Sequence, residues 1–242
     1  MGRERKNKKD GKIKRRKILG IQTHETMLGY RDRKIVVACK DFVHDEDRLL
    51  EMRTLKNQVI GQDEYLGESG MSVTGDMVDL TALLQHLRKN PIIQRLAEPE
   101  SAERHFWETA LVDIYIDNKD RDNGNRGLLY HSADKSYTIA PVYDNGNSFS
   151  TKASVQQLER YLEEPSDKWA IRMTGSRTPY ILGEHLLSAK KFLSLNEPGL
   201  RQAVKDIVPE IQNKQKEIDE FIAGIPAQYR GIPVCGEVQK EF

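Results

Sequence analysis

A dense polar segment, residues 117–127, lies between stretches of the chain that have clear apolar patterns. It reads Asp-Asn-Lys-Asp-Arg-Asp-Asn-Gly-Asn-Arg-Gly. Apolar residues recur at helical spacing in the segment before it, 98–117, which predicts a long helix. Two short apolar runs after it, 128–130 and 137–140, flank a polar turn and predict a β-hairpin. The sequence therefore predicts a loop of carboxylates and amides held between a helix and a hairpin.

A calcium-binding loop is one interpretation of this segment, because carboxylates alternate at Asp120 and Asp122. An EF-hand loop needs oxygen ligands at its first, third and fifth positions, glycine at the sixth and glutamate at the twelfth. Counted from Asn118, the sixth position is Asn123, and the twelfth is Leu129, which has no ligand oxygen. The pattern disfavours a calcium site.

Phosphoryl transfer fits the segment better. Asp120 and Asn125 are five positions apart, as the Asp and Asn of a protein-kinase catalytic loop are. In such a loop the Asp accepts the proton of the substrate hydroxyl, and the Asn offers a neutral oxygen to magnesium. Asp144, 19 residues after Asn125, follows the hairpin and precedes Gly146 by two positions. Each piece alone could be an ordinary polar turn, but their order along the chain favours a phosphotransferase.

Two motifs carry a resemblance to a known family: Asn118-x-Asp120-Arg121-x-x-x-Asn125 and Ala140-Pro141-x-Tyr143-Asp144. They resemble the HipA-like serine/threonine kinases, in particular the CtkA-like branch, over about residues 18–225. The family usually has His where this chain has Asp122. The resemblance implies an α+β, protein-kinase-like fold. Its parts would be a mainly helical C-terminal lobe with a catalytic-loop hairpin and a small, truncated N-terminal β lobe.

The resemblance also implies cofactors and roles for individual residues. ATP and Mg²⁺ would be the cofactors, Asp120 the catalytic base, and Asn125 and Asp144 the magnesium ligands. The hinge strand that meets adenine through backbone groups would consist of Val37, Ala38, Cys39, Lys40 and Asp41. A protein substrate and an antitoxin partner are implied in the same way.

Some parts of a kinase are not found upstream of this hinge. Gly2, Gly11 and Gly20 form no G-x-G-x-x-G loop, and the lysines there lie in no strand-like context. We therefore keep two expectations of function. The first is an ATP- and magnesium-dependent serine/threonine kinase. The alternative is a truncated kinase or pseudokinase that acts as a binding scaffold.

Charge is unevenly distributed along the chain. The whole chain has a net charge of +1, yet residues 1–17 carry ten basic and two acidic side chains. We expect a flexible tail there, with weak contact to a nucleic acid or an acidic partner as the alternative. The predicted divisions are this tail, a remnant N-terminal lobe with the hinge at 18–42, and a helical lobe at 43–242.

The remaining composition excludes several classes of protein. No apolar run approaches the roughly 18 residues of a membrane helix, and no apolar segment of a secretory signal follows the basic N-terminus. The two cysteines, Cys39 and Cys235, form neither a disulfide framework nor a metal-ligand pair by spacing. We expect a cytoplasmic protein that does not contact the membrane.

Local patterns elsewhere predict further elements. Lys34–Lys40 is expected to be a mostly buried strand that includes a buried Cys39. The other expectations are a strand at 22–29, a helix at 45–59, a polar loop at 61–71, and helices at 77–87, 155–162, 179–191 and 200–222.

Overall fold

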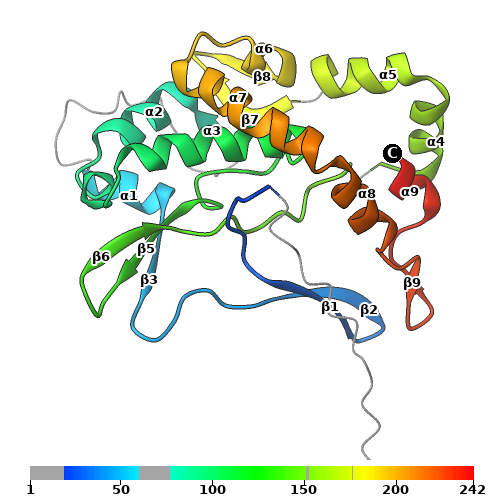
Figure 1. Ribbon diagram of the computed structural model, residues 1–242, viewed down its shortest axis with the longest axis horizontal. Coiled ribbons are helices and arrows are strands. Elements are labelled where there is room, and N and C mark those ends of the chain that lie inside the picture. Colours follow the sequence, from blue (N-terminus) through cyan, green and yellow to red (C-terminus); the bar gives the residue numbers. More distant parts are fainter. Residues whose placement is uncertain (1–18, 60–76, 151–152, 176) are drawn as a thin grey trace, which may run out of the picture.

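The computed structural model describes residues 19–59, 77–150, 153–175 and 177–242. Figure 1 shows helices α2, α3 and α7 packed together in its upper half, with small sheets below and above them. These helices span Leu80–Lys89, Glu100–Tyr115 and Pro198–Asn213. The mixed α+β fold that we expected is confirmed, and its core lies around α3.

Helix α3 is the centre of that core because one broad face of it is apolar. Phe106, Trp107 and Ala110 on this face are almost completely buried. Helix α7 crosses α3 at Gly199, where a Cβ atom would lie only 2.4 Å from the Trp107 ring. Glycine at this position therefore lets the two helices approach closely.

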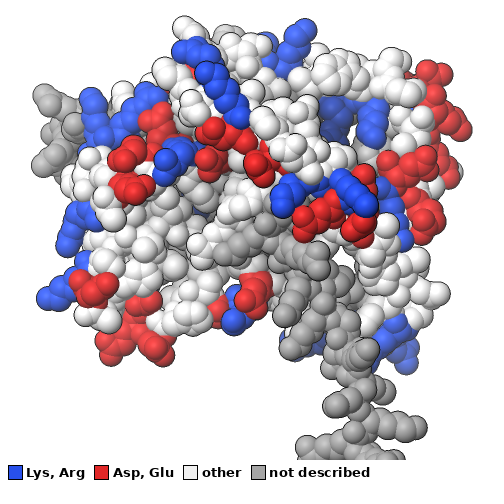
Figure 2. Space-filling model, in the orientation of Figure 1, with Lys and Arg blue, Asp and Glu red and all other residues white. Residues whose placement is uncertain are grey.

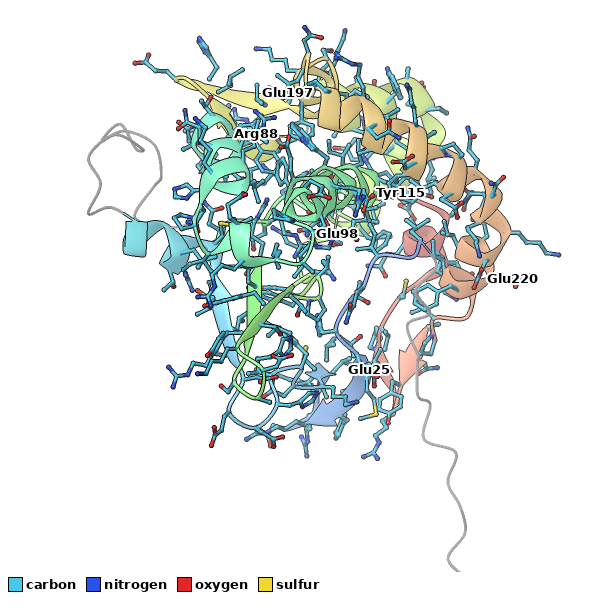
Figure 3. The ribbon with its side chains drawn as sticks, turned by 60° about the vertical axis from the view of Figure 1, so that its left-hand side comes forward. Glu25, Arg88, Glu98, Tyr115, Glu197 and Glu220 are labelled. Carbon is cyan, nitrogen blue, oxygen red and sulfur yellow. The ribbon has the colours of Figure 1, made fainter. Side chains whose placement is uncertain are left out.

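A charged cluster ties α2, α3 and α7 together at the edge of the core. The Nε and Nη2 of Arg88 donate to the two carboxylate oxygens of Glu103 at 2.8 and 2.7 Å. Nη2 also donates to Glu197, just before α7, at 3.0 Å. Figure 3 labels Arg88 and Glu197, which lie close together at the top of that view. Trp107 Nε1 donates to Glu103 as well, at 3.1 Å, so the cluster joins the hydrophobic core.

The predicted hairpin is confirmed as part of a three-stranded antiparallel sheet. The strand order is β3-β5-β6, with bounds Arg48–Glu51, Gly127–His131 and Ser136–Ile139. The helix that we expected at 45–59 is wrong in its first half, and only α1, Met52–Val59, is helical. Leu49 and Leu50 instead pair with Leu129 and Leu128 of β5, a contact between segments distant in sequence.

A second sheet replaces the helix that we expected at 179–191. Its strands β4 (Val78–Asp79), β7 (Arg177–Leu182) and β8 (His185–Ser188) lie in the order β4-β7-β8. Tyr180 of β7 is buried against the rings of Phe106 and Phe192. This tertiary packing overrides the local helical pattern. Only Ala189–Leu193, α6, is helical here.

The N-terminal hairpin corrects another expectation. Strands β1 (Thr26–Arg31) and β2 (Lys34–Cys39) pair antiparallel around a two-residue turn. All of β2 except Ile35 is exposed, and Cys39 is exposed rather than buried. The reason is that β1 and β2 pair only with each other among the strands of the described residues.

The C-terminal part is mainly helical, as expected, but its long helix is interrupted. Helix α7 ends at Asn213 and α8 begins at Gln215, so 200–222 is two helices. The remaining elements are α4 (Val155–Glu163), α5 (Pro165–Ala170), a π-helical turn (Ile171–Gly175), β9 (Gln228–Tyr229), β10 (Ile232–Pro233), α9 (Glu237–Glu241) and a short 3₁₀ turn before α3 (Ile93–Arg95). The expected polar loop at 61–71 lies outside the described residues.

The described surface mixes charges of both signs. On the face drawn in Figure 2, basic and acidic side chains are interspersed, with acidic ones gathered at the right-hand edge, where Figure 1 places α4 and α5. Among the described residues, no helix has both the length and the apolar composition needed to cross a bilayer.

Candidate active site

The polar loop between α3 and β5 starts from a buried amide. Asn118 Nδ2 donates to Asp113 Oδ1 on α3 at 2.9 Å. Asn118 Oδ1 in turn accepts from the backbone N–H of Asp120 at 3.3 Å. Both Asn118 and Asp113 are buried. The last residues of the helix therefore fix the direction in which Asp120 leaves it.

Asp120 and Asn125 are brought together across the loop. Asn125 Nδ2 donates to the backbone oxygen of Asp120 at 2.7 Å. Because its amide nitrogen is used in this way, the Asn125 side-chain oxygen can face a ligand. Asp120 is exposed, so its carboxylate is accessible to a hydroxyl group from solvent.

Asp122, which stands where the HipA-like kinases usually have His, helps to order the loop through its own side chain. Its Oδ1 accepts from the backbone N–H groups of Gly124 at 2.6 Å and Asn125 at 3.0 Å. An Asp side chain that accepts from backbone N–H groups two and three positions later forms an Asx turn, which fixes the backbone of residues 122–125. A Cβ atom on Gly124 would lie 2.9 Å from Arg53 Cζ, so the loop lies tightly against that side chain.

Arg121 connects the loop to the segment that carries Asp144. Its guanidinium is buried and forms two hydrogen bonds with Asp113, at 3.0 Å from Nε and 2.9 Å from Nη2. Nη1 donates to the backbone oxygen of Tyr143, and that of Asp144 lies 3.5 Å away. Arg121 thus brings the backbone of the Asp144 segment next to that of Asn125, which itself holds the backbone of Asp120.

Asp144 occupies a sharp turn. Its φ is +54°, in the left-handed region, whereas Gly146 two positions later has no positive φ. The hydroxyl of the preceding Tyr143 donates to the backbone oxygen of Gly124 at 2.8 Å. Burial raises the pKa of Tyr143, and nearby Glu51 adds to this effect, so the phenol stays protonated as a donor.

Two further residues, which the sequence did not indicate as site residues, form contacts that support the loop. One is Asp113, whose signal was a carboxylate inside a long apolar helix. The other is Arg126, whose Nη2 donates to the Arg121 backbone oxygen at 2.6 Å and to the Tyr180 hydroxyl at 3.0 Å. The Arg126 guanidinium lies 5.2 Å from the centre of the Phe106 ring.

His105 lies in the same region and is held neutral. A cavity behind the loop is lined by His105, Arg126 and apolar side chains of α3 and β6. Burial lowers the pKa of His105 to about 4, and the positive charges of Arg126 and Arg121 contribute. An uncharged imidazole therefore packs beneath the loop at neutral pH.

The predicted hinge residues lie on the exposed hairpin. Val37, Ala38 and Cys39 end β2, and Lys40 and Asp41 follow it, all of them exposed. The next residue, Phe42, lies against Tyr143, with ring centres 5.4 Å apart. The N–H of His24 also donates to Val142 O at 3.1 Å. The end of the hinge segment thus reaches the residue that precedes Asp144.

The oxygen ligands that Asn125 and Asp144 offer can be compared with those that Mg²⁺ requires. Mg²⁺ is commonly bound by one or two carboxylates together with phosphate oxygens and water. The Asp144 carboxylate is exposed, and the Asn125 oxygen is directed away from its own hydrogen bond. Within the described residues no cluster of three His, Cys, Asp or Glu side chains forms a protein cage for a metal. The residues present fit magnesium held together with a phosphate ligand.

Three other polar residues lie in this region, and two of them, Ser150 and Arg172, form hydrogen bonds. Ser150 Oγ donates to Asp117 Oδ2 at 2.8 Å, and Ser148 is buried. Arg172 Nη2 donates to the backbone oxygen of Tyr115 at 2.6 Å.

Comparison with known proteins gives a curated relative and several solved structures, two of which are described below. No protein-family model matches the chain. The serine/threonine-protein kinase CtkA of Helicobacter pylori is 34% identical over 135 residues, which are 56% of this chain and 38% of that protein. The match thus spans well under half of the relative's length.

The solved structures differ in how closely they match. The crystal structure of the proinflammatory kinase CtkA of H. pylori superposes with a TM-score of 0.76 and 27% identity, covering 93% of this chain and 74% of that one. HipA of Shewanella oneidensis, solved with HipB and operator DNA, gives a TM-score of 0.45 and 14% identity over 88% of this chain and 48% of that one. The second likeness is too weak to carry an argument.

Proposed function

We propose that this chain is a HipA-like kinase of the CtkA type, and that it transfers the γ-phosphate of ATP to a serine or threonine hydroxyl of a protein. The observation that carries the proposal is that the buried Arg121 guanidinium contacts the backbone of both Asn125 and the Asp144 segment, while Asn125 holds the backbone of Asp120. These are the residue types that phosphoryl transfer needs, in the order along the chain that kinases use.

Each residue has a role that follows from its chemistry. Asp120 would orient the substrate hydroxyl and accept its proton. Asn125 and Asp144 would hold Mg²⁺, which supplies positive charge to the phosphates when it is bound. Phe42 and the backbone of 37–41 would contact adenine, since Phe42 already lies against Tyr143. An antitoxin partner and a cytoplasmic location remain predictions from the resemblance.

Phosphate transfer from ATP to a generic Ser/Thr protein substrate tests the proposal. Replacing Asp120 with Ala should lower the rate about 100- to 10,000-fold, the usual contribution of a general base. Asp134→Ala is the matched control, because Asp134 is an exposed carboxylate in the β5–β6 turn. Equal rates for the parent and Asp120→Ala would overturn the assignment of the base.

A folded parent protein that transfers no phosphate would favour the scaffold alternative. In that case deletion of residues 1–17 should abolish a salt-dependent interaction with nucleic acid, since those residues carry ten basic side chains. If the protein is instead a kinase whose activity does not use residues 1–17, its rate of phosphate transfer should be unchanged by the same deletion.

A further inference from the structure

The segment that carries Asp144 has little regular structure to hold it. No helix or strand includes 143–147, and Asp144 itself has a left-handed backbone with φ +54°. Such a conformation is unfavourable for a residue other than glycine and persists only where its surroundings impose it. The contacts that fix this turn therefore determine where the Asp144 carboxylate points.

Arg121 supplies those contacts. Arginine has five N–H donors in a rigid plane. Those on Nε and Nη2 reach the Asp113 carboxylate, which is buried on α3. Nη1 reaches the backbone oxygen of Tyr143, with that of Asn125 at 3.4 Å. One buried side chain thus links the helix, the end of the catalytic loop and the start of the Asp144 turn.

Asn145, the residue after Asp144, forms the last contact of this linkage. Arg121 Nη2 donates to the Asn145 side-chain oxygen. Asp144 is therefore held between two neighbours, Tyr143 by its backbone oxygen and Asn145 by its side chain. Asn145 is partly exposed, so it contributes little to the hydrophobic core.

We propose that Arg121 and Asn145 are positioning residues that fix the Asp144 turn, and with it the orientation of the magnesium ligand. The assignment rests on the proposed function for its effect on metal binding. The hydrogen-bonded linkage, Asp113 to Arg121 to Asn145, is a property of the fold and can be measured without nucleotide. A lysine in place of Arg121 keeps the charge but cannot form these hydrogen bonds together.

A purely structural ion pair is the competing explanation, and the chain contains a matched example. Arg88 also forms two hydrogen bonds to one carboxylate of α3, that of Glu103. It contacts neither the catalytic loop nor the Asp144 turn in the contacts described for it. Arg88→Lys therefore removes the same chemistry from α3 without touching the proposed linkage.

Native-state hydrogen exchange tests the linkage directly. The reporters are the N–H of Val142, which donates to Gln22 O, and the N–H of Phe149, which donates to Ile116 O, on either side of the turn. We expect both amides to exchange about tenfold faster or more in Arg121→Lys and in Asn145→Ala. The amides of α7 should be unchanged in Asn145→Ala, and Asn145→Asp, which keeps an acceptor, should restore protection.

The outcomes separate the two explanations. Unchanged exchange at both reporters in Asn145→Ala, or equal acceleration in Arg88→Lys, would overturn the proposal. If Arg121→Lys does not fold, the Asn145 variants still decide it. The second readout is the Mg²⁺ concentration that half-saturates ATP binding, which should rise about tenfold in Asn145→Ala and stay constant in Arg88→Lys.

This second readout also distinguishes the two proposals. A parent protein that binds no ATP contradicts the proposed function and leaves the exchange result to decide the linkage. ATP binding with the same magnesium dependence in the parent and Asn145→Ala contradicts the positioning role alone.

Discussion

Arg88 and Glu197 are 109 positions apart in the sequence, yet Arg88 Nη2 lies 3.0 Å from a carboxylate oxygen of Glu197. Arg88 also holds Glu103 with two hydrogen bonds, so one guanidinium joins α2, α3 and the start of α7. This cluster supports the helix from which the catalytic loop leaves. It lies at the opposite end of α3 from the catalytic loop, so it stabilises the helix packing without contacting the candidate active site.

Replacement of Arg88 with Met should lower the free energy of unfolding by about 1–2 kcal/mol. The loss is smaller than for a fully buried charged pair, because the Arg88 side chain is 44% exposed. Chemical denaturation of the two proteins measures the difference.

The dependence of this stability loss on pH provides a check. The hydrogen bond from Arg88 lowers the pKa of Glu103, so this stability is present above the ordinary glutamate pKa and disappears as pH falls through the lowered value.

Replacement of Gly199 with Ala should destabilise the fold by about 1–3 kcal/mol, because the added methyl group would overlap the Trp107 ring. Gly236→Ala is the control, since its nearest side-chain atom would be 3.7 Å away. The midpoints of thermal unfolding compare the two variants. An equal effect at both positions would contradict the close approach of α3 and α7.

His105 should make the protein sensitive to moderate acid. Its folded-state pKa is lowered to about 4, below the unfolded value, so its contribution to stability is present above about pH 6.5 and is lost as pH falls toward 4. His105→Gln should flatten the dependence of the free energy of unfolding on pH in this window. His185, which is exposed, gives the control variant His185→Gln. The same slope in the parent and His105→Gln would contradict a partly buried, neutral imidazole.

Asp122→Ala should lower the transfer rate about 10- to 100-fold, because the second half of the loop loses the acceptor that orders it. Asp122→Asn retains an acceptor oxygen and should keep most of the activity. Steady-state phosphate transfer measures both. A fully active Asp122→Ala would show that the loop is ordered without this side chain.

The parts of the fold that depend on local pattern could be predicted from the sequence. The apolar face of α3, the hairpin at 128–140 and the order Asp120, Asn125, Asp144 are all encoded within short windows. The strand at Arg48–Glu51 could not be predicted, because it exists only through pairing with β5. In the same way, Tyr180 makes 177–182 a strand by packing on Phe106 and Phe192.

The sequence indicates Asp120, Asn125 and Asp144 as candidate site residues, but it does not indicate the residues that hold them in place. Asp113 reads as one polar residue within an apolar helix, and its partner Arg121 reads as one more charge in a polar loop. Their burial depends on the three-dimensional arrangement of α3, the loop and the Asp144 turn. The exposure of Cys39 likewise could not be predicted from the apolar run around it. It follows from the β1–β2 hairpin, whose strands pair only with each other among the described strands.

Calorimetric titration of the folded protein with ATP, with and without magnesium, measures whether Asn125 and Asp144 form a magnesium–nucleotide site. We predict binding that requires magnesium in the parent and in the Asp134→Ala control, and that is lost in Asp144→Ala. Absence of binding to the folded parent, or binding that is equally strong in Asp144→Ala, would contradict a magnesium–nucleotide site built from Asn125 and Asp144.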